Sequence, residues 1–466
     1  MAKQPLIIFT LLMFFIGDLS QASPPDPTLQ MEKAIAQEAQ SIASRYAKMG
    51  WFSGSLLVSI HNKVIYQDAL GYQDIQASQP NTPETKYNLG SIAKDFTKVL
   101  VFQQIERGNL SLDDKLAKFK LGFPHSIASQ ISLRHLLNHR SGFADIFNAE
   151  YRQNPLKFDS LQKKLQLLLD DPLLFKPGTK QRYSNYGYIV LGAVLEKVTG
   201  QSYETLLKHN IFQPLKLRAT SLYASKEDKT QSIPYTFLYN NTLEHVGVTE
   251  HPGPDGGIQS NIFDLRTFYR ALFYTNQLLN PENPQVRAAF AMNGEAWASY
   301  GGGLGVSAAA EIDLKNQVEV IVLANTDQLV AERISGRIKQ FIQSTDYADI
   351  MLPPENFAYS RFKQLDSANF YNDFDAEYNH HGYTQFIGKT INVLGMQLIK
   401  ARKWEEAFAI FAYLVHLFPD APQVYDSLAY AYFSNDQKDK AKEVFKQSLA
   451  IQADFQSEYV SHNYHL

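Results

Sequence analysis

The sequence predicts an α+β fold, an antiparallel sheet with helices, followed by an all-α helical region. Residues 55–60 and 64–70 are rich in aliphatic and β-branched side chains and flank the short polar segment 61–63, which is typical of a β-hairpin. Residues 308–314 and 317–324 repeat this pattern late in the chain. Because helical patterns occupy the region between the hairpins, we expect both hairpins to join one antiparallel sheet that carries the helices.

The chain is long enough for more than one domain. Its 466 residues are 45% hydrophobic and 13% aromatic, which is the composition of a packed globular protein. We expect the α+β domain to span residues 30–345. Asn, Asp, Tyr and Phe, together with two adjacent prolines, dominate residues 346–384, which we interpret as a linker. Helical repeats are expected over residues 385–460.

A period of 34 residues supports the C-terminal prediction. Four pairs of similar residues have this offset: Leu394 with Leu428, Gly395 with Ala429, Ala407 with Ala441, and Phe411 with Phe445. The period resembles that of the tetratricopeptide repeat. Since two units are fewer than the roughly three that a solenoid needs, we expect them to pack on a helix within residues 370–390 or on the α+β domain. They are also a candidate binding surface for a protein partner.

The N-terminus has the features of a secretory signal peptide. A basic residue precedes an apolar run over residues 6–16, and the sequence Ser-Gln-Ala at positions 20–22 matches the pattern before a cleavage site. We therefore expect residues 1–22 to be removed. The apolar run is shorter than the ~20 residues that span a bilayer core, so no stable membrane span should remain. We predict a secreted or periplasmic protein.

Charge and residue content argue against several functions. The formal net charge is −3 and no long Lys/Arg run occurs, which excludes the electrostatic pattern of a nucleic-acid-binding protein. The chain has no cysteine, so it has no disulfide, thiol nucleophile or zinc–thiolate site. His135 and His139 have the i, i+4 spacing of zinc ligands, but no glutamate follows His135 as the metalloprotease pattern requires. We expect neither a metal nor a cofactor.

The segment Ser-Ile-Ala-Lys at residues 91–94 carries the strongest chemical signal. A serine hydroxyl becomes a good nucleophile only when a neighbouring base takes its proton. Lys94 follows Ser91 by three positions, and side chains at this helical spacing have Cβ atoms roughly 5–6 Å apart. Tyr183 and Asn185 form a second motif, Tyr-Ser-Asn. Together these residues provide a nucleophile, two proton-transfer groups and an amide, as acyl transfer requires.

The surrounding sequence distinguishes Ser91 from two other serines that precede a lysine at the same spacing. Apolar residues recur at helical spacing after Ser91 until Gly108, which suits a helix C-terminus. Ser91 is therefore expected near a helix start, where free N–H groups favour negative charge. Ser160 begins a charged amphipathic helix and Ser360 lies in an irregular segment, so we attribute these two matches to chance.

These segments resemble the serine β-lactamase-like family, which includes class C β-lactamases, D-alanyl-D-alanine carboxypeptidases, D-aminopeptidases and esterases. The resemblance covers roughly residues 35–345 and rests on segments 87–94, 131–142, 177–178, 183–192 and 256–265. It implies the transpeptidase fold of β-lactamases and penicillin-binding proteins. It also implies that Ser91 is the nucleophile, Lys94 and Tyr183 are the general-base pair, and Asn185 orients the substrate or Lys94.

The resemblance further implies an oxyanion hole with the Ser91 N–H as one donor. In such enzymes the second donor lies on a strand with a Lys-Thr-Gly or His-x-Gly motif, which corresponds to residues 299–305 here. Gly302 keeps the backbone open, and the Gly303 N–H would complete the hole. Tyr300 stands where a cation is expected. Since that cation binds the carboxylate of β-lactams and D-peptides, its absence favours an ester, or an amide without this carboxylate.

We therefore predict an exported serine hydrolase that forms an acyl-enzyme with a small-molecule or peptide substrate. No separate carboxylate base for deacylation is evident. A second interpretation stays open: a catalytically inactive domain that acts as a binding module or scaffold. Tyr300 and the appended repeats favour the scaffold, whereas the intact set of Ser91, Lys94, Tyr183 and Asn185 favours the enzyme.

Overall fold

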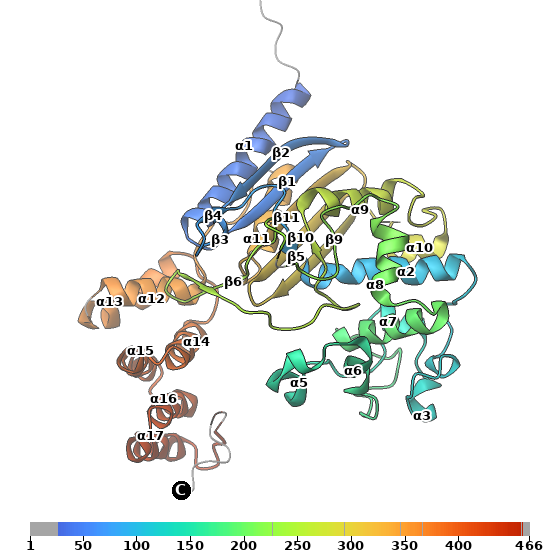
Figure 1. The fold of residues 1–466 in the computed structure, drawn as a ribbon. Helices are drawn as coiled ribbons and strands as arrows, with labels where there is room; N and C mark the ends of the chain where they lie inside the picture. The colour runs from blue at the N-terminus through green and yellow to red at the C-terminus, as the bar shows by residue number, and fades with distance from the viewer. Residues whose placement is uncertain are drawn as a thin grey trace, which may run out of the picture.

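The structure is a computed structural model that describes residues 27–225, 227–292, 294–344, 346–365, 367–457 and 459. The predicted signal peptide lies outside these residues. The described chain forms an α+β domain and a C-terminal all-helical region (Figure 1), which confirms the predicted fold class.

A five-stranded antiparallel sheet with the order β2-β1-β11-β10-β9 organises the α+β domain. Its strands are β1 (Gly54–Ile60), β2 (Lys63–Leu70), β9 (Ala296–Gly303), β10 (Val306–Asp313) and β11 (Val318–Ala324). The two predicted hairpins are β1–β2 and β10–β11. They join through the pairing of β1 with β11, which confirms that both belong to one sheet. The strand β9 adds the edge that faces the candidate site.

Three pairs of short strands surround this sheet: β3 with β4, β5 with β8, and β6 with β7. Their bounds are β3 (Tyr72–Asp74), β4 (Gln79–Pro80), β5 (Tyr87–Asn88), β6 (Tyr235–Phe237), β7 (Leu243–His245) and β8 (Gln259–Ser260). The strand β5 ends shortly before Ser91 in the chain, and its pairing with β8 therefore fixes the start of the segment that carries the serine.

Helices cover both faces of the central sheet (Figure 1). Those nearest to it are α1 (Pro27–Lys48), α2 (Ala93–Glu106), α9 (Ile262–Tyr274) and α11 (Val330–Ser344). Side chains alternate between the faces of a strand. Leu56 of β1 therefore packs in the core with α1 and α11, whereas Leu57 packs in the core with α2 and α9.

A helical subdomain completes the α+β domain and packs around the buried helix α7. Its elements are η1 (Gly90–Ile92), η2 (Leu116–Lys118), α3 (His125–Ala128), α4 (Leu133–Leu137), α5 (Ala149–Gln153), η3 (Pro155–Lys157), α6 (Leu161–Gln166), α7 (Asn185–Thr199), α8 (Tyr203–Leu207), η4 (Lys208–Phe212) and α10 (Pro284–Ala289). Since α7 starts at Asn185, the predicted Tyr-Ser-Asn motif lies at a helix N-terminus close to α2.

The C-terminal region is helical throughout, including most of the predicted linker. Its helices are α12 (Pro354–Gln364), α13 (Ser367–His380), α14 (Ile387–Lys400), α15 (Trp404–Leu417), α16 (Pro422–Ser434) and α17 (Lys438–Ile451). A Cβ at Gly395 would lie 2.3 Å from Phe411 Cζ, so α14 and α15 cross where the sequence has a small residue. The assignment of α14–α17 to tetratricopeptide repeats remains a prediction.

The helical region contacts the α+β domain through α12. The Asn356 side chain donates hydrogen bonds to the Leu238 carbonyl (2.6 Å) and to Asn241 Oδ1 (3.0 Å) in the turn between β6 and β7. The rings of Tyr239 and Tyr359 pack edge to face at 4.7 Å. One hydrophobic cluster continues from Tyr239 through α13 into α14–α16. This arrangement agrees with the expected packing of the repeats on a preceding helix.

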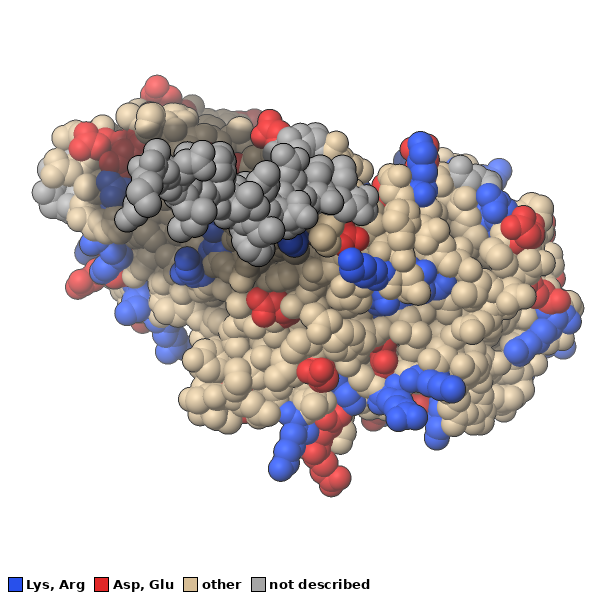
Figure 2. Space-filling model, turned by 90° about the horizontal axis from the view of Figure 1, so that it is seen from above, with Lys and Arg blue, Asp and Glu red and all other residues tan. Residues whose placement is uncertain are grey.

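Within the described residues, no helix is long and apolar enough to cross a membrane. Figure 2 shows Lys and Arg side chains interspersed with Asp and Glu on one face of the molecule. The described part of that face therefore presents no extended surface of a single charge.

Candidate active site

Ser91 lies on η1, the turn that leads directly into α2. The preceding residue, Gly90, has φ +52°, a left-handed conformation that favours glycine. Its N–H donates to Asn88 Oδ1 at 2.8 Å, which closes the turn. A Cβ at Gly90 would lie only 2.9 Å from the Gly302 nitrogen. Glycine at this position therefore lets β9 run directly beside the turn that carries Ser91.

Lys94 and Tyr183 both contact the Ser91 hydroxyl. Lys94 Nζ donates to Ser91 Oγ at 3.0 Å, and the Tyr183 hydroxyl donates to the same oxygen at 2.8 Å. Lys94 is only 5% exposed, whereas Tyr183 is 49% exposed. One proton-transfer group thus approaches Ser91 from the protein interior and the other from the open side. The structure brings together the three residues predicted as catalytic.

Lys94 also contacts two oxygen atoms beneath the serine. Its Nζ donates to Asn185 Oδ1 at 2.7 Å and to the backbone carbonyl of Asp255. Together with Ser91 Oγ, these acceptors satisfy all three N–H donors of an ammonium group. The geometry therefore places the Lys94 side-chain nitrogen directly under the nucleophile. Asn185 contacts Lys94, one of the two roles expected for it.

Asp145 holds Asn185 in this orientation, a role that the sequence did not indicate. Its Oδ1 accepts the Asn185 backbone N–H at 3.0 Å, and its Oδ2 accepts the Asn185 side-chain amide at 3.2 Å. Because the amide group donates to Asp145, its oxygen is left to accept from Lys94. Asp145 lies in an irregular segment without a recognisable motif, so it could be identified only from the structure.

His139 supports Tyr183 from the side. The two rings stack with centroids 4.4 Å apart and planes at 28°. His139 Nδ1 accepts the Ser184 N–H at 3.3 Å. Burial, together with the charge of Lys94, lowers the pKa of His139 to about 4. His135 instead caps α4, where its ring bonds the Ser132 N–H. In the described chain, no group of three or more His, Cys, Asp or Glu is placed to hold a metal ion.

The lowered pKa of His139 predicts a pH-dependent loss of stability. An unfolded histidine titrates near 6.5, so between pH 6.5 and 4 the unfolded chain binds a proton that the folded chain does not. The free energy of unfolding should therefore fall as pH decreases through this window, by up to about 3 kcal/mol from this residue. Urea unfolding at a series of pH values would measure the effect. Asparagine can adopt the φ of +55° found at residue 139, so it is a suitable replacement for the histidine. The free energy of unfolding of His139→Asn should depend less steeply on pH than that of the wild-type protein, and an equal dependence would contradict the assignment.

The strand β9 places backbone amides beside Ser91. A Cβ at Gly301 would lie 3.0 Å from the Ser91 nitrogen and 2.0 Å from the Leu89 carbonyl oxygen. Gly302 and Gly303 both line the cavity in front of Ser91. Since the Gly302 nitrogen lies close to Gly90, the Gly302 amide is the stronger candidate for the second oxyanion donor. Gly303 lies at the end of β9.

Tyr300 does not line this cavity. Its hydroxyl donates to the Glu311 carboxylate, which also accepts from Lys339 of α11 at 2.7 Å. These contacts lie on the face of the sheet that α1 and α11 cover, whereas Ser91 lies on the opposite face. Ser299 instead contacts Tyr269 of α9. The position of Tyr300 therefore does not agree with the expected substrate contact. Because successive side chains of a strand point to opposite faces, an alignment of β9 that is displaced by one residue assigns Tyr300 to the wrong face.

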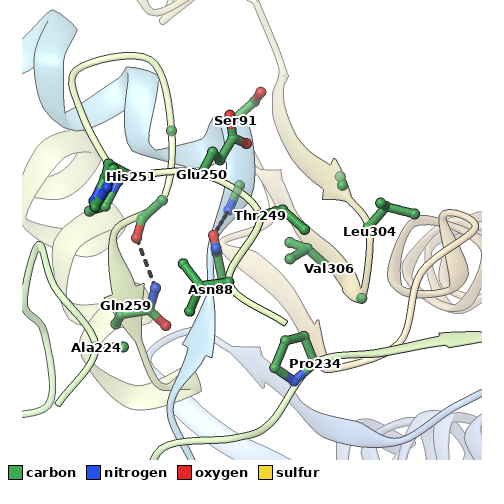
Figure 3. A pocket seen from close by; sticks show the side chains of 18 of the residues that line it. Asn88, Ser91, Ala224, Pro234, Thr249, Glu250, His251, Gln259, Leu304 and Val306 are labelled. Carbon is green, nitrogen blue, oxygen red and sulfur yellow. Dashed lines mark hydrogen bonds between the residues drawn. The ribbon is translucent and has the colours of Figure 1, made fainter. Parts of the chain in front are cut away.

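Ser91 opens into a cavity of about 340 Å³. Asn185 and the turn between β9 and β10 form part of its wall, and the loop 247–252 forms another part (Figure 3). Glu250 and Asp255 line the cavity, whereas no Lys or Arg appears among its described lining residues. Glu250 lies in a loop without a motif, so no sequence pattern indicates that it lies in the cavity wall.

Comparisons with known proteins agree with this geometry. The family model described as Beta-lactamase matches residues 39–343. Penicillin-binding protein 4* of Bacillus subtilis is 25% identical over 292 residues, which are 59% of this chain and 64% of the relative. Teichoic acid D-alanine hydrolase of Staphylococcus aureus is 30% identical over 42% of this chain and 48% of its own length. The chain thus covers less than two thirds of each.

A solved structure shows the same fold. The octameric penicillin-binding protein homologue from Pyrococcus abyssi aligns with a TM-score of 0.59 and 22% identity, over 71% of this chain and 82% of that chain. The matched family segment ends at residue 343, before α12 begins at Pro354. The family similarity therefore accounts for the α+β domain and leaves the C-terminal helices outside it.

Proposed function

The chain belongs to the β-lactamase family of serine hydrolases, and we propose that it cleaves an ester or an amide through an acyl-enzyme on Ser91. The observation that carries this proposal is the pair of hydrogen bonds to Ser91 Oγ, from Lys94 Nζ and from the Tyr183 hydroxyl. A serine in these contacts has a route for its proton in either direction, so it can act as a nucleophile and later as a leaving group.

The Lys94–Tyr183 pair enters the reaction with one proton fewer than in these contacts, as a Tyr183 phenolate beside the Lys94 ammonium group. In the first step Ser91 Oγ attacks the carbonyl carbon of the substrate and transfers its proton to this pair, at the Tyr183 oxygen. The same pair then protonates the leaving alcohol or amine, since Tyr183 reaches the open side of the site. A water molecule repeats the sequence on the acyl-enzyme, and Ser91 regains its proton. Lys94 stabilises negative charge on Tyr183 or Ser91 in these steps, because its ammonium group contacts the serine oxygen and lies 5.0 Å from the Tyr183 ring centroid.

The substrate carbonyl oxygen becomes negatively charged during both steps. We assign its stabilisation to the backbone N–H groups of Ser91 and Gly302, which the close packing of η1 and β9 brings to the same wall of the cavity. One donor of this kind typically contributes about 3–4 kcal/mol to the transition state. Glycine at residue 301 supports the role because a larger residue there would separate the two backbones.

Export of the chain to the periplasm or the cell exterior also belongs to this proposal, as does a protein partner for the C-terminal helices. The segment 1–22 supports export through its charge, apolar run and cleavage pattern. The relative named teichoic acid D-alanine hydrolase has a name that refers to a cell-wall polymer, which is consistent with a site outside the cytoplasm.

Covalent labelling of the mature protein tests the proposed nucleophile. After incubation with a fluorophosphonate probe, intact-protein mass should show a single adduct on the wild-type protein and none on Ser91→Ala. A parallel incubation with a penicillin would show whether the site also accepts β-lactams. A folded wild-type protein that forms no adduct with either reagent would contradict the enzyme and support the alternative of an inactive binding module.

A further inference from the structure

Glu250 is a carboxylate in the cavity wall that the reaction described above does not use. It lies on the loop 247–252, and Figure 3 shows it at the same end of the cavity as Ser91. The hydroxyl of Tyr151, which is buried, donates to Glu250 Oε2 at 3.0 Å and fixes the side chain. Among the described residues, Glu250 forms no ion pair, and its Oε1 accepts no hydrogen bond. One oxygen of a positioned carboxylate is therefore available to a ligand.

A second carboxylate lies beside Glu250 in the cavity wall and forms a buried ion pair. Asp255 provides this carboxylate and is 7% exposed, and its buried Oδ1 has no hydrogen-bond partner among the described residues. The nearest cation to that oxygen is Lys164 Nζ at 3.8 Å, which donates to the His251 carbonyl instead. Lys94 has all three N–H donors occupied. Lys164 therefore offsets the charge of Asp255, and Glu250 is the carboxylate of the described cavity lining that has no ion-pair partner.

Electrostatics around Glu250 favour a cationic ligand. Burial raises the pKa of Glu250, and the negative charge of Asp255 raises it further, whereas Lys164 and Lys94 lower it. Glu250 is nevertheless exposed, so solvent reaches its carboxylate when the cavity is empty. A cation next to Glu250 would stabilise that ionised form, whereas a carboxylate-bearing substrate would be repelled by it.

We propose that Glu250 binds an ammonium group that the substrate carries close to its scissile carbonyl. The cationic group donates to the free oxygen of Glu250, which Tyr151 holds in place through the other oxygen. The substrate class is therefore an ester or amide with a primary amine on the acyl part or on the leaving group. This inference rests on the proposed hydrolase function, since the amine must lie in the cavity that contains Ser91.

Two pairs of esters with matched shapes test the inference. The first pair is the 4-nitrophenyl ester of alanine, in both enantiomers, and that of 2-methylpropanoic acid, which replaces the ammonium by methyl. The second pair is the 2-aminoethyl and propyl esters of butanoic acid. For at least one pair, wild-type kcat/KM should favour the cationic ester, and Glu250→Gln should reduce this preference about 10- to 100-fold, the usual effect of one charge-assisted hydrogen bond. Tyr151→Phe should reduce it less, because the carboxylate stays but loses its positioning contact.

Glu244→Gln is the matched control. Glu244 lies on β7 in the same part of the chain, is exposed, and is absent from the cavity lining. It should leave the preference of the wild-type protein unchanged. Thermal melts of all variants would identify any that fail to fold, and Tyr151→Phe provides the readout if Glu250→Gln does not fold.

Three results would overturn the inference. An unchanged preference in folded Glu250→Gln for both pairs would show that the carboxylate does not recognise the amine. An equal loss of kcat on cationic and neutral esters would instead make Glu250 a proton-transfer group. If no ester is hydrolysed in a Ser91-dependent manner by the wild-type protein, the proposed function fails together with the subsite, and this outcome is distinct because the neutral esters are inactive as well.

Discussion

Lys94→Met should reduce kcat about 10³-fold or more while the protein still folds. Methionine has nearly the length of lysine but no hydrogen-bond donor, so Ser91 Oγ loses its 3.0 Å contact with residue 94. The Lys94–Tyr183 pair that accepts the Ser91 proton also loses one of its two members. A positioned acid or base alone typically contributes about 10²–10⁴-fold. The ammonium charge that stabilises the transition state is removed as well, which places the expected loss in the upper part of that range. Ester turnover and the rate of fluorophosphonate labelling would measure it.

Lys98→Met is the matched control for this prediction. Lys98 follows Lys94 by one helical turn on α2 and is also largely buried, so burial lowers its pKa. Its Nζ contacts the Ala289 carbonyl at 3.3 Å and lies 5.1 Å from the ring centroids of Phe290 and Trp297, away from Ser91. This variant should keep activity within a few fold. If Lys94→Met were as active as Lys98→Met, the role of Lys94 in proton transfer would be wrong.

The two hairpins and the helix after Ser91 could be predicted because their signals are local. A run of aliphatic and β-branched residues, a polar turn and a C-terminal glycine each depend on a few neighbouring residues, and the structure has β1–β2, β10–β11 and α2 within two residues of the expected bounds. The contacts among Ser91, Lys94 and Tyr183 were expected because two motifs with recognisable order supply them. Local patterns of this kind need no knowledge of the tertiary fold.

Tyr300, Asp145 and Glu250 show what the sequence does not determine. The face on which Tyr300 lies depends on the register of β9, and a run of glycines leaves that register without a hydrophobic pattern to define it. Asp145 and Glu250 lie in loops whose paths are set by distant contacts, such as the hydrogen bond from Tyr151 to Glu250. Polar residues in such loops give no periodic signal, so their approach to the site appears only in three dimensions.

Gly301→Ala should both destabilise the protein and reduce acylation about 10²-fold or more. A Cβ at this position would lie 2.0 Å from the Leu89 carbonyl oxygen, 2.9 Å from the Leu89 carbonyl carbon and 3.0 Å from the Ser91 nitrogen. All three are backbone atoms, so no side-chain rotation relieves the overlap. The edge strand β9 must move away from η1, which separates the Gly302 amide from Ser91. Loss of one oxyanion donor typically costs about 10²–10³-fold in kcat.

Gly302→Ala on the same strand separates this steric effect from a general intolerance of β9 to alanine. A Cβ there would meet only Leu329 Cδ2, at an ordinary contact distance of 3.5 Å, and the backbone amide is retained. We therefore expect Gly302→Ala to melt close to the wild-type protein and to keep most of its labelling rate. If Gly301→Ala kept the wild-type labelling rate, or if both variants lost activity equally, the close approach of β9 to Ser91 would not be what forms the second half of the oxyanion hole. A selective loss in Gly301→Ala would tie catalysis to the separation between β9 and η1, because the two variants add the same methyl group one residue apart.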